Sequence, residues 1–306
     1  MLDFKALKKA DLHRHLDGSL RPSTMIELGR KFNVDIPDDF HFSPNMTLEK
    51  ALSFFETSLK LLQEKNELIR VAKEIVEDAN KDNVTTLEVR FGPHLHQQKN
   101  LRLEEIIDSV LEGLNGQAGL ILCGLYGDDP NLLETYVNLA KTRGGIVAID
   151  LAGGPSPTQK FRLEDYAKAY SMAKEIGLGR TVHASEGRDP KEIVTAVSVL
   201  HAQRLGHATT LLQSSEAIDL VLENNVTVES CPTSNWQCGV VQDLAHHPLP
   251  QWLDKGINVC VNTDNTYFSN ITLSEEYMNA MDMPGMTESK ILSCLNQGFQ
   301  AAFNMR

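Results

Sequence analysis

The chain has 306 residues and a formal charge of −12, with 42% hydrophobic and 23% charged residues. This acidic balance excludes a general binder of nucleic acid or of anionic membranes, because both need a basic surface. The composition is typical of a soluble globular enzyme, and no uncharged run reaches the roughly 20 residues that a membrane-spanning helix requires.

The beginning and the cysteines of the sequence indicate a cytoplasmic location. The first residues, M-L-D-F-K-A-L-K-K-A-D-L-H, lack the apolar core of a secretory signal. Five cysteines are scattered without a C-x-x-C pair, which favours reduced thiols. No low-complexity tract or flexible linker divides the sequence, so we expect a single domain over residues 1–306.

Eight short apolar or β-branched runs predict strands along the chain. In order they are Ala10–Leu16, Val84–Phe91, Gly119–Tyr126, Ile146–Leu151, Arg180–Ala184, Gln203–His207, Val226–Cys231 and Ile257–Asn262. Helical spacing of apolar residues lies between most of them, at Leu103–Leu114, Asn131–Thr142, Leu163–Ile176, Pro190–Leu200 and Ser215–Glu223. The stretch from Leu48 to Asn83 is long enough for more than one helix. It predicts a helical insertion after the first strand, of the kind that often covers an active site.

The repeated alternation of strand and helix predicts a (β/α)₈ (TIM) barrel. A doubly wound open sheet is the alternative. The position of reactive side chains separates the two, because in a barrel they converge at the carboxyl ends of many strands.

Histidines, carboxylates and an amide gather where the predicted strands end, and none lies at an amino end. They are His13 and His15 in the first strand, His183 and Glu186 at the fifth, His207 at the sixth, and Asp264 and Asn265 after the eighth. Scattered surface residues would not sort in this way. The pattern therefore favours the barrel.

Four of these residues predict a metal site. His13 and His15 share one face of a strand, because side chains alternate along it, and His183 and Asp264 complete a set of three nitrogens and one oxygen. Such a set, with room for water, suits one catalytic Zn²⁺ per chain, and zinc lowers the pKa of a bound water to about 7. Taken alone, His-x-His is more often a solvated strand, and Asp264 could cap a helix.

Two further residues are not needed as ligands. Glu186 follows His183 by three residues, where a general acid would stand beside the metal; the alternative is a solvated loop carboxylate. His207 could orient the attacking hydroxide, although it could instead be a further ligand or a buried structural imidazole.

Seven motifs of the sequence resemble the successive signatures of adenosine deaminases, a family of the amidohydrolase superfamily. The motifs are D-L-H-R-H-L-D-G-S-L, E-V-R-F-G-P-H-L, I-D-L-A-G, V-H-A-S-E, R-L-G-H-A, C-P-T-S-N and V-N-T-D-N. They occur in the order of that family from about residue 11 to residue 265. The resemblance implies a zinc-bearing barrel that converts adenosine to inosine and ammonia.

The resemblance also implies a role for each matching residue. The metal ligands would be His13, His15, His183 and Asp264. Glu186 would protonate N1 of the purine, and His207 would position the hydroxide. Asp264 would accept the proton of the hydroxide and pass it to the departing ammonia. Asp17 would bind a ribose hydroxyl beside His15, and the N–H of Gly153 would bind N3. Asn265 stands where many members have an aspartate that contacts N7, and its amide can donate there as well.

Other functions stay open at this point. The substrate could be another 6-aminopurine, such as adenine, methylthioadenosine or aminodeoxyfutalosine, although Asp17 favours a nucleoside. A hydrolase of esters, lactones or phosphotriesters would need a bridging lysine for two metals, which no strand end supplies. A non-enzymatic nucleoside-binding protein would not need Glu186 and His207 together. His94 and His96 repeat the His-x-His spacing in a turn, where we expect no metal.

Overall fold

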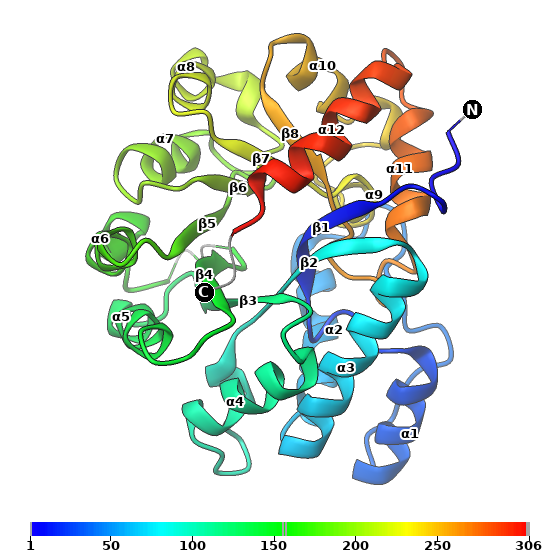
Figure 1. The fold of residues 1–306 in the computed structure, drawn as a ribbon, viewed down its shortest axis with the longest axis vertical. Coiled ribbons are helices and arrows are strands. Elements are labelled where there is room, and N and C mark those ends of the chain that lie inside the picture. Colours follow the sequence, from blue (N-terminus) through cyan, green and yellow to red (C-terminus); the bar gives the residue numbers. More distant parts are fainter. Residues whose placement is uncertain (1, 155, 157, 304–306) are drawn as a thin grey trace.

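The computed structural model describes residues 2–154, 156 and 158–303. Eight parallel strands follow one another around a barrel in chain order (Figure 1). They are β1 (Lys9–His15), β2 (Val84–Phe91), β3 (Gly119–Leu125), β4 (Ile146–Ala152), β5 (Gly179–Ala184), β6 (Arg204–His207), β7 (Thr227–Ser230) and β8 (Asn258–Val261). The predicted (β/α)₈ barrel is confirmed, and no predicted strand boundary is more than one residue from the observed one.

The barrel closes between β8 and β1 just beyond the last residue of β8. There the N–H of Asp264 donates to the carbonyl oxygen of His13, and the N–H of His15 donates to the carbonyl oxygen of Asp264, both over 2.8 Å. Arg14 and Asp264 form a parallel bridge at the same place. The doubly wound open sheet is therefore wrong, because its edge strands would stay unpaired.

Twelve helices of the described chain surround and cover the barrel. They are α1 (Pro22–Phe32), α2 (Leu48–Leu61), α3 (Lys65–Lys81), α4 (Leu103–Leu114), α5 (Pro130–Ala140), α6 (Ala167–Glu175), α7 (Lys191–Ser198), α8 (Ser215–Glu223), α9 (Pro232–Gln237), α10 (Leu249–Asp254), α11 (Leu273–Met281) and α12 (Glu288–Ala301). The predicted helix over Leu163–Ile176 begins instead as a short 3₁₀ turn, η2 (Leu163–Tyr166), that leads into α6.

The predicted insertion over Leu48–Asn83 contains two helices, α2 and α3, in agreement with the expectation of more than one helix, and a further helix, α1, precedes it. The sequence analysis did not predict α1, which packs against α2. The next helix, α3, packs against β2 and α4 and so belongs to the outer ring of the barrel. At the other end of the chain, α12 lies across β8 and β1, where the barrel closes (Figure 1).

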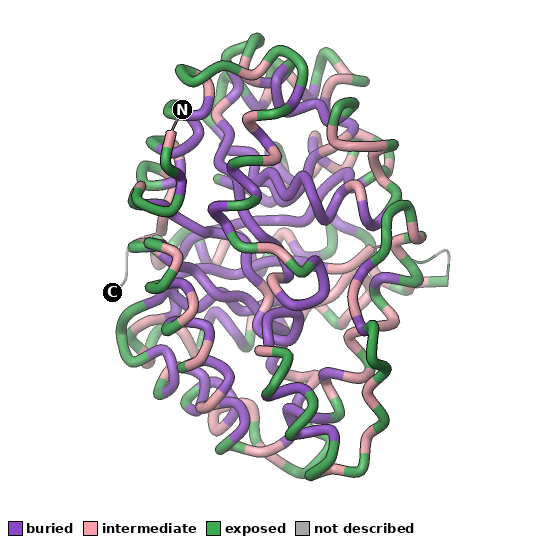
Figure 2. The backbone as a smooth tube through the Cα atoms, turned by 90° about the vertical axis from the view of Figure 1, so that its right-hand side faces the viewer, coloured by how far each residue is buried: buried purple, intermediate pink, exposed green. Residues whose placement is uncertain are grey.

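Hydrophobic spacing explains how the ring helices attach to the barrel. In α4, the buried side chains Ile106, Ile107 and Val110 follow the helical repeat and face inward. Buried segments accordingly run through the middle of the molecule and exposed segments lie on its rim (Figure 2). All five cysteines are free and buried. Among the described residues, we find no helix with both the length and the apolar character needed to cross a membrane.

Candidate active site

The carboxyl ends of three strands bring three histidines and one aspartate together. His13 and His15 come from β1, His183 from β5, and Asp264 follows β8. Nε2 of His15 lies 3.2 Å from Nε2 of His183. Oδ1 of Asp264 lies 3.6 Å from Nε2 of His13 and 3.4 Å from Nε2 of His15. The four residues that the sequence analysis placed around a metal thus form one cluster.

Buried carboxylates hold the outer nitrogens of two of these histidines. Nδ1 of His13 lies 2.6 Å from Oε2 of Glu229. Nδ1 of His183 lies 3.0 Å from Oδ2 of Asp150. Because an ionised carboxylate only accepts hydrogen bonds, both Nδ1 atoms carry the proton and both Nε2 atoms turn a lone pair toward the cluster.

The cluster therefore fits a cation. Nε2 of His13 is buried and has no hydrogen-bond partner in the part of the chain that the structure describes. The imidazole nitrogens and a carboxylate oxygen converge there, and a divalent metal would be a common partner for them. The pKa values of His13 and His15 lie well below the usual range, mainly because both imidazoles are buried. Neutral imidazole is the form that binds metals.

A buried ionic network holds the carboxylates of Glu229 and Asp150 in place. Arg90 forms ion pairs with Glu229 at 2.8 Å and with Asp150 at 2.9 Å. Arg204 forms a second ion pair with Glu229 at 2.6 Å. Burial alone would raise the pKa of Asp150, but His183 and Arg90 bring it below its usual range, so that this carboxylate stays ionised.

The sequence analysis did not assign roles to this network, although a signal for it was present. Its members are buried charged residues within largely apolar strands, and fully buried charges are rare unless they are paired. They are Glu88 and Arg90 in β2, Asp150 in β4, Arg204 in β6 and Glu229 in β7. Their partners, however, come from distant strands that the sequence does not align.

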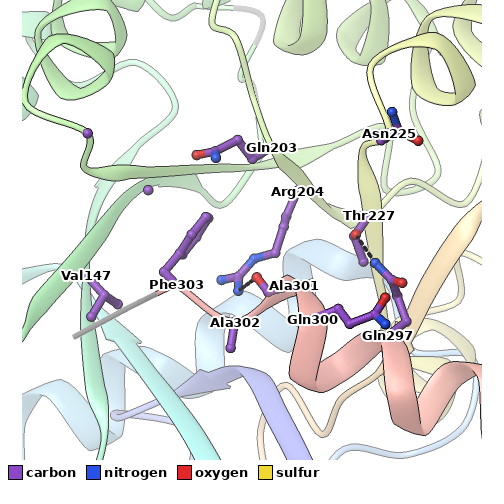
Figure 3. A pocket seen from close by; sticks show the side chains of 12 residues that line it. Val147, Gln203, Arg204, Asn225, Thr227, Gln297, Gln300, Ala301, Ala302 and Phe303 are labelled. Atoms are coloured by element: carbon purple, nitrogen blue, oxygen red, sulfur yellow. Dashed lines mark hydrogen bonds between the residues drawn. The ribbon is translucent and has the colours of Figure 1, made fainter.

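Arg204 extends the network to the amino-terminal end of the barrel. Its guanidinium donates to the carbonyl oxygen of Ala301 over 3.0 Å and lies 3.8 Å from the ring centre of Phe303 (Figure 3). A cavity of about 390 Å³ opens beside these residues, with Gln203 and Asn225 among its lining. Because barrel enzymes place their chemistry at the carboxyl ends of the strands, we assign this end a structural role.

Glu186 stands beside the cluster of three histidines and Asp264. Its side chain is buried, and its Oε1 lies 3.8 Å from Nε2 of His207. Burial raises the pKa of Glu186, although the charges of Arg188 and His183 oppose this effect. A carboxyl group that holds its proton to a higher pH than an exposed glutamate is suited to general acid catalysis.

Helix α9 holds two groups of the site in place. Its Ser234 hydroxyl donates to Oδ2 of Asp264 over 2.6 Å. Its Asn235 side chain lies 2.9 Å from Nδ1 of His207. Burial lowers the pKa of His207 to about 3, so this imidazole is neutral. The sequence analysis quoted C-P-T-S-N without giving either residue a role, because their contacts depend on how α9 turns back over the barrel.

Two adjoining cavities open beside the cluster. The smaller, of about 50 Å³, is lined by His183, Glu186, His207 and Asp264 among others. The larger, of about 290 Å³, has a mostly apolar wall. That wall includes Leu52, Phe55 and Leu59 of α2, together with Leu95, Leu125 and Tyr126. Both cavities share His15 and Gly153, so together they offer a small-molecule site that reaches the cluster.

The three remaining predicted contact residues also line these cavities. Asp17 lines the larger one, and Asn265 the smaller. Within the described chain, Oδ1 of each is buried without a hydrogen-bond partner. Burial raises the pKa of Asp17 to about 7. Gly153 has a φ of 72° and lies where the cavities meet, so its main chain is close to both.

His94 and His96 lie away from the cluster. Nδ1 of His94 lies 2.9 Å from the hydroxyl oxygen of Tyr136, and Nδ1 of His96 donates to the carbonyl oxygen of Leu62 over 2.7 Å. Neither histidine belongs to a group of side chains that could hold a metal in the described residues.

Known proteins that resemble this chain are deaminases. The family model described as adenosine deaminase matches residues 8–305. An adenosine deaminase of Clostridium botulinum is 35% identical over 328 residues, which cover 100% of this chain and 97% of that protein. The adenine deaminase of Arthrobacter aurescens has the same fold, with a TM-score of 0.86 at 23% identity, over 98% of this chain and 94% of that one. The Arabidopsis N6-mAMP deaminase has a TM-score of 0.86 at 25% identity, over 98% of this chain and 95% of that one.

Proposed function

The chain belongs to the adenosine deaminase family of hydrolases, and on that premise we propose that it converts adenosine and 2′-deoxyadenosine to inosine and ammonia. The observation that carries the proposal is the convergence of three histidines and Asp264, with the protonatable Glu186 beside them. Attack of water at C6 of a purine needs both an activated nucleophile and a proton at N1, and these groups can supply them.

His13, His15, His183 and Asp264 would hold one zinc ion. Three imidazoles and one carboxylate are a donor set that zinc prefers. Bound zinc would supply a Lewis acid that makes water nucleophilic near neutral pH.

The protein's own groups would move the protons. Glu186 would donate its proton to N1 as water attacks C6, which breaks the aromaticity of the ring. Asp264, held at Oδ2 by Ser234, would take a proton from the water and deliver it to the departing amino group. As the C6–N bond breaks and C6 becomes a carbonyl, the proton left on the C6 hydroxyl would return to Glu186. His207, neutral and buried, would hold the attacking oxygen in place.

The nucleoside would occupy the two cavities. The N–H of Gly153 would bind N3 of the purine, and the side-chain amide of Asn265 would bind N7. The unpartnered Oδ1 of Asp17 would accept a hydrogen bond from a ribose hydroxyl, beside His15. Because a buried acceptor without a partner costs free energy, such a ligand hydroxyl would be bound favourably.

The lining of the larger cavity argues against a 5′-phosphate. Its acidic side chains are Asp17 and Glu56, and no lysine or arginine is among its described lining residues. Leucines dominate the rest of the wall, so a small apolar group in place of the 5′-hydroxyl would also fit. Methylthioadenosine is therefore the second candidate substrate.

A substrate panel with metal analysis tests the proposal. Purified zinc-loaded protein is mixed with adenosine, 2′-deoxyadenosine, methylthioadenosine, adenine, aminodeoxyfutalosine and N6-methyl-AMP, and kcat/KM is compared. We expect the highest value for adenosine and one zinc per chain. A zinc-loaded protein that releases no ammonia from adenosine contradicts the proposal, and two metals per chain would favour a two-metal hydrolase.

A further inference from the structure

A chain of hydrogen bonds leads from the main chain of α10 into the site. The N–H of Leu249 lies 3.1 Å from Nδ1 of His247. Nε2 of His247 lies 3.2 Å from Oδ1 of Asn235, whose Nδ2 lies 2.9 Å from Nδ1 of His207. The three side chains are almost fully buried, so water does not compete for these bonds.

The first donor of this chain determines the direction of every later bond. A backbone N–H can only donate, so Nδ1 of His247 must accept. Burial lowers the pKa of His247, so its imidazole is neutral and holds its one proton on Nε2. The atom of Asn235 that faces it must then be the oxygen. The amide nitrogen of Asn235 is therefore the atom that faces His207.

The orientation of the Asn235 amide determines the tautomer of His207. Because the amide of Asn235 donates to Nδ1 of His207, the proton of this neutral imidazole lies on Nε2. That nitrogen is on the side of Glu186, whose Oε1 lies 3.8 Å away, and His207 lines the smaller cavity. His207 thus presents an N–H to the cavity rather than a lone pair.

We propose that His247 and Asn235 are positioning residues that make His207 a hydrogen-bond donor to the oxygen of the attacking water. This inference rests on the proposed deamination for its chemical meaning. A donor orients a lone pair of that oxygen and stabilises charge on it, whereas the other tautomer would offer only a lone pair. Without His247, the amide of Asn235 has two nearly equivalent orientations, and one of them would draw the proton of His207 onto Nδ1.

The tautomer itself can be observed without any activity measurement. In zinc-loaded protein with ¹⁵N-labelled histidine, a protonated ring nitrogen and a bare one differ strongly in chemical shift. We expect bare Nδ1 and protonated Nε2 for both His247 and His207. A spectrum in which Nδ1 of His207 carries the proton overturns the inference, even if the protein deaminates adenosine. If no substrate reacts, the proposed function fails while this spectrum still decides the tautomer.

Substitutions of His247 then test its role. H247L removes the donor to Asn235, and we expect kcat for adenosine to fall about 100-fold, as for loss of one transition-state donor. KM and zinc content should change less than about threefold, because no ligand or substrate contact is removed. H247Q can still donate an amide N–H to Asn235, and we expect it to keep most of kcat and the native tautomer of His207.

The neighbouring histidine provides the matched control. His246 is exposed, and its side chain has Asp243, at 2.7 Å, as its one partner in the described part of the chain, so H246L should change neither kcat nor the tautomer. Equal losses in H247L and H247Q with an unchanged His207 spectrum would mean a merely structural role and would contradict the proposal. Wild-type kcat in H247L would contradict it as well.

Discussion

The N–H of Asp264 donates to the carbonyl oxygen of His13 over 2.8 Å, so the residue that closes the barrel also carries a carboxylate into the histidine cluster. Closure of the barrel and assembly of the site are therefore the same structural event. The main chain fixes where Asp264 stands, and Ser234 fixes how its carboxylate is turned. Changes to the Asp264 side chain can consequently alter the site while leaving the closing hydrogen bonds in place.

D264A should abolish metal binding without opening the barrel. The closing bonds use the main chain of Asp264, whereas the substitution removes the only carboxylate among the four predicted ligands. We expect zinc content to fall from about one per chain to near zero and kcat to fall by about 10³-fold or more. Metal analysis and circular dichroism check both parts. D219A, at an exposed position on α8, is the control, and full zinc content in D264A would contradict the assignment.

Glu229 and Glu88 provide a matched pair of buried carboxylates. Both form ion pairs with Arg204, but only Glu229 also contacts a predicted ligand, His13. Each substitution to glutamine leaves a buried arginine short of a countercharge, so each should destabilise the fold by about 3–5 kcal/mol. E229Q alone should also weaken zinc binding, by about 10- to 100-fold, because it replaces the charged acceptor of Nδ1 of His13 with a neutral amide. Denaturation and competition with a chelator separate the two effects. Equal zinc affinities in E229Q and E88Q would contradict this prediction.

E186Q tests the general acid. The amide has nearly the same shape but cannot supply a proton to N1, so kcat should fall by about 10²- to 10⁴-fold while zinc content stays near one per chain. Steady-state kinetics and metal analysis measure this, with the exposed E223Q on α8 as control. A variant that keeps wild-type kcat would remove Glu186 from the mechanism.

The sequence was sufficient for the barrel because strands and ring helices leave local patterns. Runs such as I-V-A-I-D-L-A show the continuous apolar character of a buried parallel strand, and His13 and His15 carry their spacing with them. The partners of those histidines leave no such pattern. Whether Glu229 meets His13, or Asn235 meets His207, depends on the register of distant strands and on the turn of α9. The first helix was missed because its apolar side is narrow, with Met25 and Leu28 as its large buried side chains.

Asp17 should make the metal-free protein less stable as the pH rises. Burial raises the pKa of this carboxyl from 3.8 to about 7, so between these pH values the folded protein holds a proton that the unfolded chain releases. Stability is therefore lost as the pH rises through this window. D17N removes the effect, and its stability relative to wild type should grow by about 2–3 kcal/mol between pH 5 and pH 8. Urea denaturation of chelator-treated protein checks this, with the exposed D38N as control. A difference that is the same at both pH values would contradict the assignment.

Substitutions of Gly18 and Asn265 should have non-additive effects on kcat/KM in a double-mutant cycle. A Cβ at position 18 would lie 1.8 Å from Oδ1 of Asn265, so G18A must push this side chain away from its place beside the smaller cavity. If Asn265 binds N7 of the purine, G18A and N265A should each lower kcat/KM for adenosine by about 10-fold, the cost of one lost hydrogen bond. The double variant should then lose little more than N265A alone, because the displaced group is already absent. Losses that simply add would show that Gly18 acts on substrate independently of Asn265, and an unchanged kcat/KM in N265A would remove the proposed contact with N7.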